Sequence, residues 1–329
     1  MSFQKDNIII GIDTSCYTTS IAAISLGKNV IFNKKVMLEV KKDSKGLRQS
    51  EAVFQHIRNL GELDKELKEF LIDYNIIGIC VSSKPRPVVD SYMPVFTVGH
   101  NFAKLASTML NCELYETTHQ ENHIEASLLT NILKNEKRFL SIHMSGGTTE
   151  ILLCERDEKS SIDYNIDIVG GSRDISFGQL IDRIGVKMGY TFPCGKYIDK
   201  NALNCKDKIE QGLKTSVKDG YMNLSGLENQ INRIFDKKSI EYLSKLLLDS
   251  VVRNMIKSIT YISKTYNVNE VVFAGGVSAS KYISRELTLR LKKYKIDAYF
   301  TKSEYSTDNA VGCAVIGVKK IENKSIKHK

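Results

Sequence analysis

Three short turns rich in small and hydroxylated residues restrict the fold of this chain more than any other feature. They lie in the stretches 8–18, 142–150 and 271–279, and each follows an apolar run. The first two turns join one apolar run to another and predict β-hairpins, whereas the third leads from a strand into a helical pattern. A double glycine at a strand end is by itself an ordinary tight turn. The three turns together, in this order, predict a split cradle for the phosphates of a nucleotide.

The first turn offers a carboxylate beside hydroxyl groups. In the segment IIIGIDTSCYTTSIAAI, Asp13 is followed by Ser15 and Tyr17. Backbone N–H groups of such a turn can face an anion while the carboxylate holds a metal ion or a water molecule. We therefore regard Asp13, Ser15 and Tyr17 as candidate catalytic residues.

The second and third turns offer glycines at the ends of strands. In SIHMSGGTTEILL the glycines allow close approach of the backbone to a ligand, and the hydroxyl groups can donate to its oxygens. In VVFAGGVSASKYISREL the N–H groups and the dipole at the start of a helix favour a nucleotide. The candidate nucleotide-binding residues of these turns are Ser145, Gly146, Gly147, Thr148, Thr149, Gly275 and Gly276.

Length and composition suit a two-lobed globular protein with a cleft between its lobes. The chain has 329 residues, of which 42% are hydrophobic and 26% charged. No apolar segment approaches the roughly 20 residues that cross a bilayer, and the N-terminus lacks the pattern of a secretory leader. Seven scattered cysteines without a C-x-x-C pair argue against a disulfide framework or a cysteine-based zinc site. We expect a soluble, cytoplasmic protein that does not interact with membranes.

The formal charge of +9 suits a partner with a phosphate backbone, so tRNA is a candidate partner. The alternative is that the lysines are simply solvated, since they are spread along the chain and gather in the terminal stretch 319–329. The aromatic pattern of an RNA-binding module is not visible. Charge alone leaves RNA binding open.

The first part of the chain predicts an α/β lobe. Strands are expected at 7–12, 20–25, 30–36 and 76–81, with helices at 50–73 and 98–110. Between them, the loop SSKPRPVVDSYMPV holds three of the four prolines. This loop is either a rigid surface connection or a preformed basic lip over a ligand, because stiffness lowers the entropy cost of binding.

The segment ETTHQENHIEASLL carries the most specific chemistry. Thr118 can cap a helix on which His119 and His123 occupy positions i and i+4, where two imidazoles can share one metal ion. Such a pair can equally be exposed or buried in a core. A glutamine follows the first histidine, so the zincin protease pattern does not fit. With His143 and Asp308 as further candidate ligands, the set would suit zinc or iron(II).

The motifs GIDTSC, H-x-x-x-H, MSGGTTE, AGGVSAS and STDN, taken together, resemble the catalytic subunit of the tRNA threonylcarbamoyladenosine synthase family, formerly called O-sialoglycoprotein endopeptidases. The resemblance extends over nearly the whole chain, with matching order and spacing. It implies the two-lobed α/β fold of actin, the sugar kinases and the heat-shock ATPases, with a nucleotide cleft between the lobes. The implied reaction passes a threonylcarbamoyl group from a mixed anhydride with AMP to an adenosine in tRNA.

The resemblance also implies roles for individual residues. Metal binding falls to His119, His123 and Asp308, while His143 stands where another branch of the family carries a ligating tyrosine. The metal would be Fe²⁺ or Zn²⁺, with Mg²⁺ as a third option, and the nucleotide would be ATP, AMP or an acyl-adenylate. Beyond the glycine turns, the implied nucleotide contacts are Asp182, Gly195 and Ser280, although Asp182 without the resemblance reads as an exposed helix residue.

The chain departs from the family pattern mainly where the acceptor would bind. Tyr17-Thr18-Thr19 replaces Asp-Glu-Thr, and Pro85-Arg86-Pro87 replaces a Gly-Pro-Gly turn. Ser280 replaces an asparagine, and Pro193-Cys194-Gly195 replaces Pro-Gly-Gly. Since the metal and nucleotide positions persist, we interpret the chain as a divergent paralogue.

Three functions stay open at this point. The first is a threonylcarbamoyltransferase acting on tRNA, and the second is a nucleotide- and metal-binding transferase or ATPase with another acceptor. The third is a non-catalytic subunit that pairs with a related subunit, as a homo- or heterodimer, through its first lobe; such a subunit would have no need of the metal ligands. We expect the first lobe to comprise 1–134 and 303–329 and the second lobe to comprise 135–302.

Overall fold

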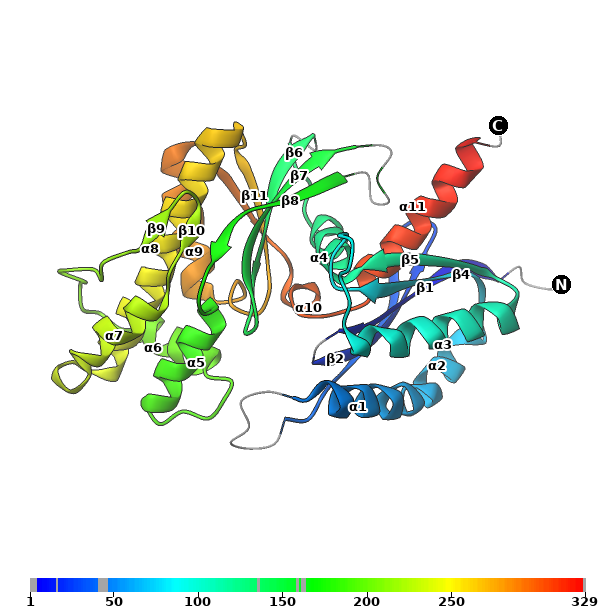
Figure 1. Ribbon diagram of the computed structural model, residues 1–329, viewed down its shortest axis with the longest axis horizontal. Coiled ribbons are helices and arrows are strands. Elements are labelled where there is room, and N and C mark those ends of the chain that lie inside the picture. The colour runs from blue at the N-terminus through cyan, green and yellow to red at the C-terminus, as the bar shows by residue number, and fades with distance from the viewer. Residues whose placement is uncertain are drawn as a thin grey trace. The chain divides into compact units, whose positions relative to one another are not determined.

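The computed structural model describes residues 5–15, 17–40, 47–134, 137–157, 160 and 164–327. The chain forms two compact units, each with its own sheet (Figure 1). Unit 1 is built mainly from Met1–Leu129 and Asp308–Lys329, and unit 2 mainly from Thr130–Asp157 and Tyr164–Thr307. The lobe boundaries expected at Lys134 and Lys302 stay predictions. Cys16, in the first turn, lies outside the described residues.

Unit 1 contains a five-stranded sheet of order β3-β2-β1-β4-β5. Its first two strands form the expected hairpin, in which Ser15 pairs with Thr18. Strands β4 and β5 run parallel to β1, so the carboxyl ends of these three strands lie along one edge of the sheet. The strands are β1 (Asp6–Ser15), β2 (Thr18–Ser25), β3 (Val30–Met37), β4 (Tyr74–Lys84) and β5 (Glu113–Thr118).

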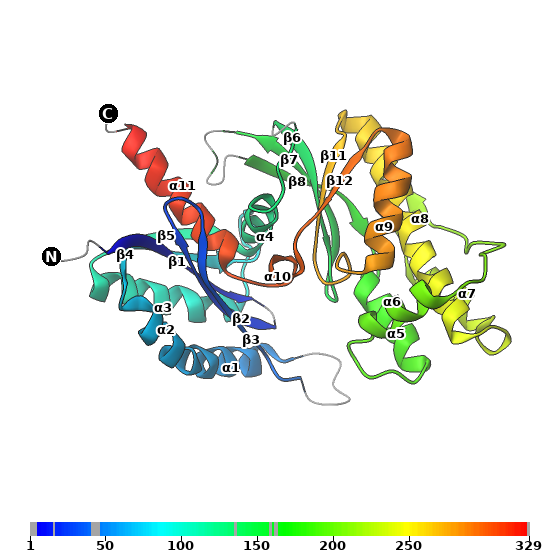
Figure 2. The same cartoon turned by 180° about the vertical axis from the view of Figure 1, so that it is seen from behind.

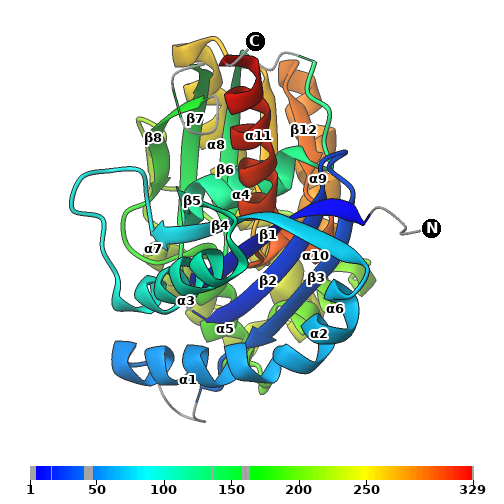
Figure 3. The same ribbon diagram turned by 90° about the vertical axis from the view of Figure 1, so that its right-hand side faces the viewer.

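Helices cover both faces of this sheet. On one face α11 (Val311–Lys327) lies so close to β1 that a side chain at Gly11 would collide with the backbone of Ala310. On the other face α3 (Pro94–Leu110) packs against β1 at Gly99. Figure 3 shows α4 (His119–Leu128) beside α11, and α1 on the side of α3. The helix expected at 50–73 is interrupted at Leu63, and forms α1 (Gln49–Glu62) and α2 (Asp64–Leu71).

Unit 2 contains a seven-stranded sheet of order β12-β11-β6-β7-β8-β10-β9. Strands β6 and β7 form the second expected hairpin, and β11 runs parallel to β6, with Ala274 beside His143. The second and third glycine turns therefore lie side by side at one edge of this sheet. The strands are β6 (Arg138–Met144), β7 (Thr149–Arg156), β8 (Tyr164–Ser172), β9 (Val217–Lys218), β10 (Tyr221–Met222), β11 (Glu270–Ala274) and β12 (Asp297–Phe300).

One hydrophobic core joins this sheet to the helices of unit 2. The long helix α8 runs beside α9, as Figures 1 and 2 show. None of the described helices is long and apolar enough to span a membrane. The helices are α5 (Phe177–Lys187), α6 (Gly195–Asn204), α7 (Ser225–Asn232), α8 (Ile240–Tyr266), α9 (Lys281–Leu291) and the short α10 (Ser303–Ser306).

Candidate functional site

Helix α4 begins at the carboxyl end of β5 and places two histidines on one face. Thr118 caps the helix as expected, and its hydroxyl accepts from the N–H of Glu121, whose carboxylate in turn accepts from the N–H of Thr118. This capping box fixes the first turn of the helix, which contains His119. His123 follows one turn later, so both imidazoles point to the same side.

Three of the candidate ligands come together within unit 1. The Nε2 atoms of His119 and His123 are 3.1 Å apart, and Oδ1 of Asp308 is 3.7 Å and 3.2 Å from them, respectively. One ligand atom from each residue lies within 4.8 Å of the others. Two nitrogen ligands of a tetrahedral ion with metal–nitrogen distances of 2.0–2.1 Å would lie roughly 3.3 Å apart. The donor set and its spacing thus fit one divalent cation.

The segment that follows Asp308 is bound by Asn122, which stands between the two histidines in the sequence. The side chain of Asn122 donates to the carbonyl oxygen of Asn309 (2.5 Å) and accepts from the N–H of Cys313 (2.8 Å). Helices α4 and α11 also approach closely, since a side chain at Gly312 would collide with the carbonyl of Asn122. The C-terminal part of the chain is therefore fixed to the helix that carries the histidines.

Asp13 lies near the carboxyl end of β1, beside the candidate metal ligand His119, and its catalytic role stays a prediction. It is fully buried, its Oδ1 lies 3.1 Å from Nδ1 of His119, and it also accepts from the hydroxyl of Ser82. Burial opposes its charge, but the nearby His119 outweighs this and holds the pKa of Asp13 below its usual value. Burial likewise opposes the charge of His119, yet Asp13 raises the pKa of His119 to about 9. A carboxylate behind a ligating histidine fixes the orientation of its ring.

The other candidate catalytic residues of the first turn differ in exposure. Ser15 is buried, whereas the side chain of Tyr17 is 43% exposed. The backbone carbonyl of Tyr17 accepts from the N–H of Leu38, which ties the turn to the end of β3. His143 lies on β6 of unit 2, and its ligation of a metal stays a prediction.

The second glycine turn is closed by its own hydroxyl group. Ser145 Oγ accepts from the N–H groups of Gly147 (3.3 Å) and Thr148 (3.1 Å). Gly146 and Gly147 are exposed, and a side chain on either would meet no atom within 4 Å. Thr149 is buried, and its hydroxyl accepts from the N–H of Phe177 at the start of α5.

Helix α5 supports this turn through residues that the sequence motifs did not single out. Ser176 Oγ donates to the carbonyl of Gly146 (2.7 Å), and a side chain at Gly178 would lie 2.5 Å from the Cα of Gly146. The pattern Ser-x-x-Gln at 176–179 is the available signal, because it predicts the capping box that starts α5.

The third turn is packed against the second. Gly275 has a φ of +95°, and a side chain there would lie 2.2 Å from the carbonyl oxygen of Met144. Its N–H donates to the carbonyl of Ser306 (2.7 Å). Gly276 is exposed, and its Cβ position is open. Ser280 caps α9 and donates to Asp199, which also accepts from the N–H groups of Lys281 and Tyr282.

Two further candidate nucleotide-binding residues lie together in unit 2. Asp182, on α5, accepts from the N–H of Cys194 at 2.7 Å, and Gly195 is the next residue and starts α6. Burial raises the pKa of Asp182 despite this hydrogen bond. Gly195 is exposed, with open space at its Cβ position.

Solved structures with the same architecture share little sequence with this chain. Full-length HypF, in a phosphate- and nucleotide-bound form, matches 97% of this chain with a TM-score of 0.60 and 13% identity; the chain spans 47% of HypF. An activator of 2-hydroxyisocaproyl-CoA dehydratase from Clostridium difficile, with bound ADPNP, matches with a TM-score of 0.52 and 10% identity, over 98% of both chains. The α/β fold of the actin-like ATPases, expected from the resemblance, is confirmed.

Sequence comparisons are more specific. A protein from Sulfurihydrogenibium sp. (strain YO3AOP1), described as tRNA N6-adenosine threonylcarbamoyltransferase, is 31% identical over 97% of this chain and 92% of its own length. A protein of the same description from Mycoplasmopsis synoviae (strain 53) is 27% identical over 95% of this chain and 99% of its own length. The family model TsaD, tRNA N6-adenosine threonylcarbamoyltransferase, matches residues 30–315, which include His119, His123 and Asp308. The chain belongs to the TsaD family.

Proposed function

We propose that this protein is a metal-dependent threonylcarbamoyltransferase that uses an acyl-adenylate as donor and an adenosine in tRNA as acceptor. The observation that carries the proposal is the convergence of His119, His123 and Asp308, whose ligand atoms lie within 4.8 Å of one another, in a chain that matches its family over nearly its whole length. A non-catalytic partner subunit would not need this donor set.

The triad would hold one divalent cation, and its two imidazoles favour Fe²⁺ or Zn²⁺ over Mg²⁺, which prefers oxygen ligands. When bound, the cation would polarise the carbamoyl carbonyl or neutralise charge on the leaving phosphate. Asp13 would keep the ring of His119 in its ligating orientation through the contact at 3.1 Å. Asn122 would keep Asp308 within reach.

The adenylate would bind along the glycine turns of unit 2. Gly146, Gly147 and Gly276 are exposed and have open space at their Cβ positions, so a ligand can approach the backbone there. Asp182 would accept from ribose hydroxyl groups next to Gly195. The ionised carboxylate of Asp182 would accept from these hydroxyls. Its protonated form, which the raised pKa favours, could also donate to one of them.

A different acceptor is the second candidate function, and the proline loop favours it. The carbonyl of Pro85 accepts from the N–H of Gln120 at 3.0 Å, which attaches this loop to the helix that carries His119. The loop residue Arg86 and the half-exposed Tyr17 therefore belong to the same unit as the triad, where the family pattern has smaller or acidic residues. These residues would favour an acceptor of other shape or charge.

Pairing with a related subunit or a second copy would use the outer face of α3. Phe102, Leu105 and Met109 follow one another at helical spacing, and their side chains are 45%, 62% and 77% exposed. Phe54 and Ile57 on the adjacent α1 are similarly exposed. The variant Leu105→Asp should lower the dimer fraction in sedimentation equilibrium, and an unchanged dimer would exclude this face.

The proposed activity is tested by reconstituted transfer. Purified protein, threonylcarbamoyl-adenylate generated in situ and tRNA with an unmodified acceptor adenosine are incubated with and without chelator, and the tRNA nucleosides are measured by mass spectrometry. We expect threonylcarbamoyladenosine that disappears with chelator and in His123→Ala. The matched control is His100→Ala, because His100 lies in unit 1 on α3, pairs with Glu116 at 3.2 Å and takes no part in the triad.

Two results would argue against the proposed activity. Unmodified tRNA together with bound nucleotide and metal would favour another acceptor. Modification that survives both the chelator and His123→Ala would contradict a metal-dependent reaction at this triad.

A further inference from the structure

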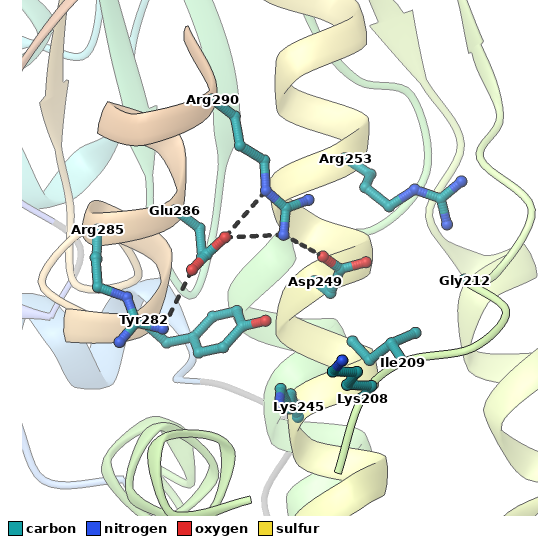
Figure 4. A pocket seen from close by; sticks show the side chains of 10 residues that line it. All are labelled: Lys208, Ile209, Gly212, Lys245, Asp249, Arg253, Tyr282, Arg285, Glu286 and Arg290. Atoms are coloured by element: carbon teal, nitrogen blue, oxygen red, sulfur yellow. Dashed lines mark hydrogen bonds and ion pairs between the residues drawn. The ribbon is translucent and has the colours of Figure 1, made fainter. Parts of the chain in front are cut away.

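A polar pocket lies within unit 2 and shares no residue with the predicted nucleotide-binding set. It has a volume of about 590 Å³, and it is lined by α8, α9 and the segment that follows α6 (Figure 4). Five of its lining side chains are cationic, namely Lys208, Lys245, Arg253, Arg285 and Arg290. Its two carboxylates leave a formal excess of three positive charges.

Both carboxylates are already paired with arginines. Asp249, which is 6% exposed, lies 2.6 Å from Nη2 of Arg290, and Glu286 lies 2.9 Å from the same atom. Glu286 also contacts Arg285 at 3.1 Å. Figure 4 shows these side chains as one connected group along α8 and α9. The two acids are thus balanced by Arg285 and Arg290.

The other three cations have no carboxylate partner among the described residues. Lys245 Nζ donates to the carbonyl oxygens of Cys205 (3.1 Å) and Asp207 (2.6 Å), and Arg253 Nη1 donates to the carbonyl of Leu213 (3.0 Å). Lys208 is exposed at the edge of the pocket. Carbonyl oxygens fix the positions of Lys245 and Arg253 but leave their charges uncompensated.

The segment that follows α6 leaves space for the guanidinium of Arg253 at Gly212. A side chain at Gly212 would lie 1.7 Å from Nη1 of this arginine, so only glycine leaves space for the guanidinium where it lies. Most of the five N–H donors of an arginine stay available when one binds a single carbonyl. Arg253 can therefore bind a ligand without leaving the contact that holds it.

We propose that this pocket binds a small phosphorylated ligand with at least two phosphate groups. Three uncompensated cations favour a multiply charged anion, and arginine and lysine donors match phosphate oxygens. The volume lies in the range of small-molecule sites. Ile209 and Tyr282 supply apolar surface for an organic portion of the ligand.

The test uses a fluorescent reporter in the pocket of the full chain. The sequence contains no tryptophan, so Ile209→Trp introduces a single one that reports on this pocket alone. Sodium pyrophosphate should change its emission in a saturable way, and orthophosphate should bind at least tenfold more weakly. Calorimetry on the chain that retains Ile209 should show the same pyrophosphate affinity. Added NaCl should weaken binding, because the contacts are between charges.

Charge variants decide whether the pocket residues are responsible. Lys208→Met and Lys245→Met, in the reporter background, should each weaken pyrophosphate binding at least tenfold, whereas Lys293→Met should leave it unchanged. Lys293 is an exposed lysine of the same unit outside the pocket. Because Lys208 is exposed, its variant should fold normally, which circular dichroism would verify.

One further variant separates this pocket from the predicted nucleotide site. Gly146→Ala, in the second glycine turn, should leave the tryptophan response to pyrophosphate intact. The proposal is overturned if pyrophosphate gives no saturable response, if neither lysine variant weakens it, or if tRNA changes the emission while pyrophosphate does not.

Discussion

The candidate metal site of unit 1 and the third glycine turn of unit 2 are held in different ways. In unit 1 the site depends on polar side chains, with Asp13 behind His119 and Asn122 bound to the backbone of Asn309, next to Asp308. In unit 2 the third turn depends on backbone packed against backbone, with Gly275 on Met144. Metal binding and the stability of the fold can therefore be disturbed separately. A change of functional group in unit 1 should affect metal binding, and an added methyl group in unit 2 should affect stability.

The largest effect is expected where the backbone of unit 2 leaves no space. Gly275→Ala must accommodate a φ of +95° and a contact of 2.2 Å with the carbonyl oxygen of Met144. We expect the free energy of unfolding to fall by on the order of 3 kcal/mol in urea denaturation. The control is Gly276→Ala, whose Cβ position is open, and equal stability losses in both variants would contradict this reason.

In unit 1 a change of a single functional group should act on binding and spare the fold. Asp13→Asn keeps the size of the side chain but removes the charge behind His119. We expect the affinity for Zn²⁺, measured by competition with a chromophoric chelator, to fall about 10- to 100-fold. An unchanged affinity would mean that Asp13 does not orient a ligand. Circular dichroism would show whether the fold is retained.

The exposed glycines of unit 2 allow a further separation of shape from binding. Gly146→Ala adds a methyl group that meets no protein atom within 4 Å, so the stability of the fold should stay nearly constant. If a nucleotide approaches this backbone, its affinity should fall about tenfold, since the methyl group would occupy the ligand's place. Calorimetry with AMP would measure this, and full affinity in the variant would place the nucleotide elsewhere.

Acid should act on unit 1 already above pH 4, through a buried histidine. Burial lowers the pKa of His56 in unit 1 to about 4, although Asp13 opposes this shift. As the pH falls, His56 therefore binds a proton near pH 6.5 in the unfolded chain but only near pH 4 in the folded chain. The free energy of unfolding should fall between pH 6.5 and 4, by on the order of 1 kcal/mol at pH 5.5. His56→Gln should flatten this slope in thermal unfolding. A slope that persists in the variant would have another origin.

Asp174 provides the counterpart in unit 2. Burial opposes its charge, but N–H groups of Leu224, Ser225 and Ile175 outweigh this and hold the pKa of Asp174 well below its usual value. Its contribution to stability is present above about pH 4 and is lost as the pH falls further. The protection factors of the α7 amides in hydrogen exchange should therefore fall only below about pH 4, and a fall already at pH 5.5 would contradict this assignment.

The sequence was most informative where function needs local patterns. The hairpins at 15–18 and 144–149 and the cap at Thr118 follow from neighbouring residues, and the structure confirms them. The spacing of His119 and His123 was enough to suggest a shared metal ion. Asp308 joined them only through the STDN motif and the family resemblance.

Other parts of the site depend on residues far apart in the chain. Nothing near Asp13 indicates His119 or Ser82 as partners, because β1, β4 and α4 become neighbours only after folding. The break at Leu63 follows Gly61, but a single glycine is tolerated within a helix, so the apolar pattern on both sides predicted one continuous helix. The hydroxyl of Ser145 accepts from an N–H group of its own turn, and the sequence motif did not predict that this N–H group is already bonded.

The position of Asp308 also has a consequence for biosynthesis. The two histidines leave the ribosome with the first part of unit 1, but the third candidate ligand, Asp308, follows only after all of unit 2 has been made. Translation proceeds at roughly 5–20 residues per second, so many seconds separate the synthesis of the histidines from that of Asp308. Metal loading at the complete triad would then be among the last steps of maturation, and a nascent chain stalled within unit 2 would hold an ion by its histidines alone.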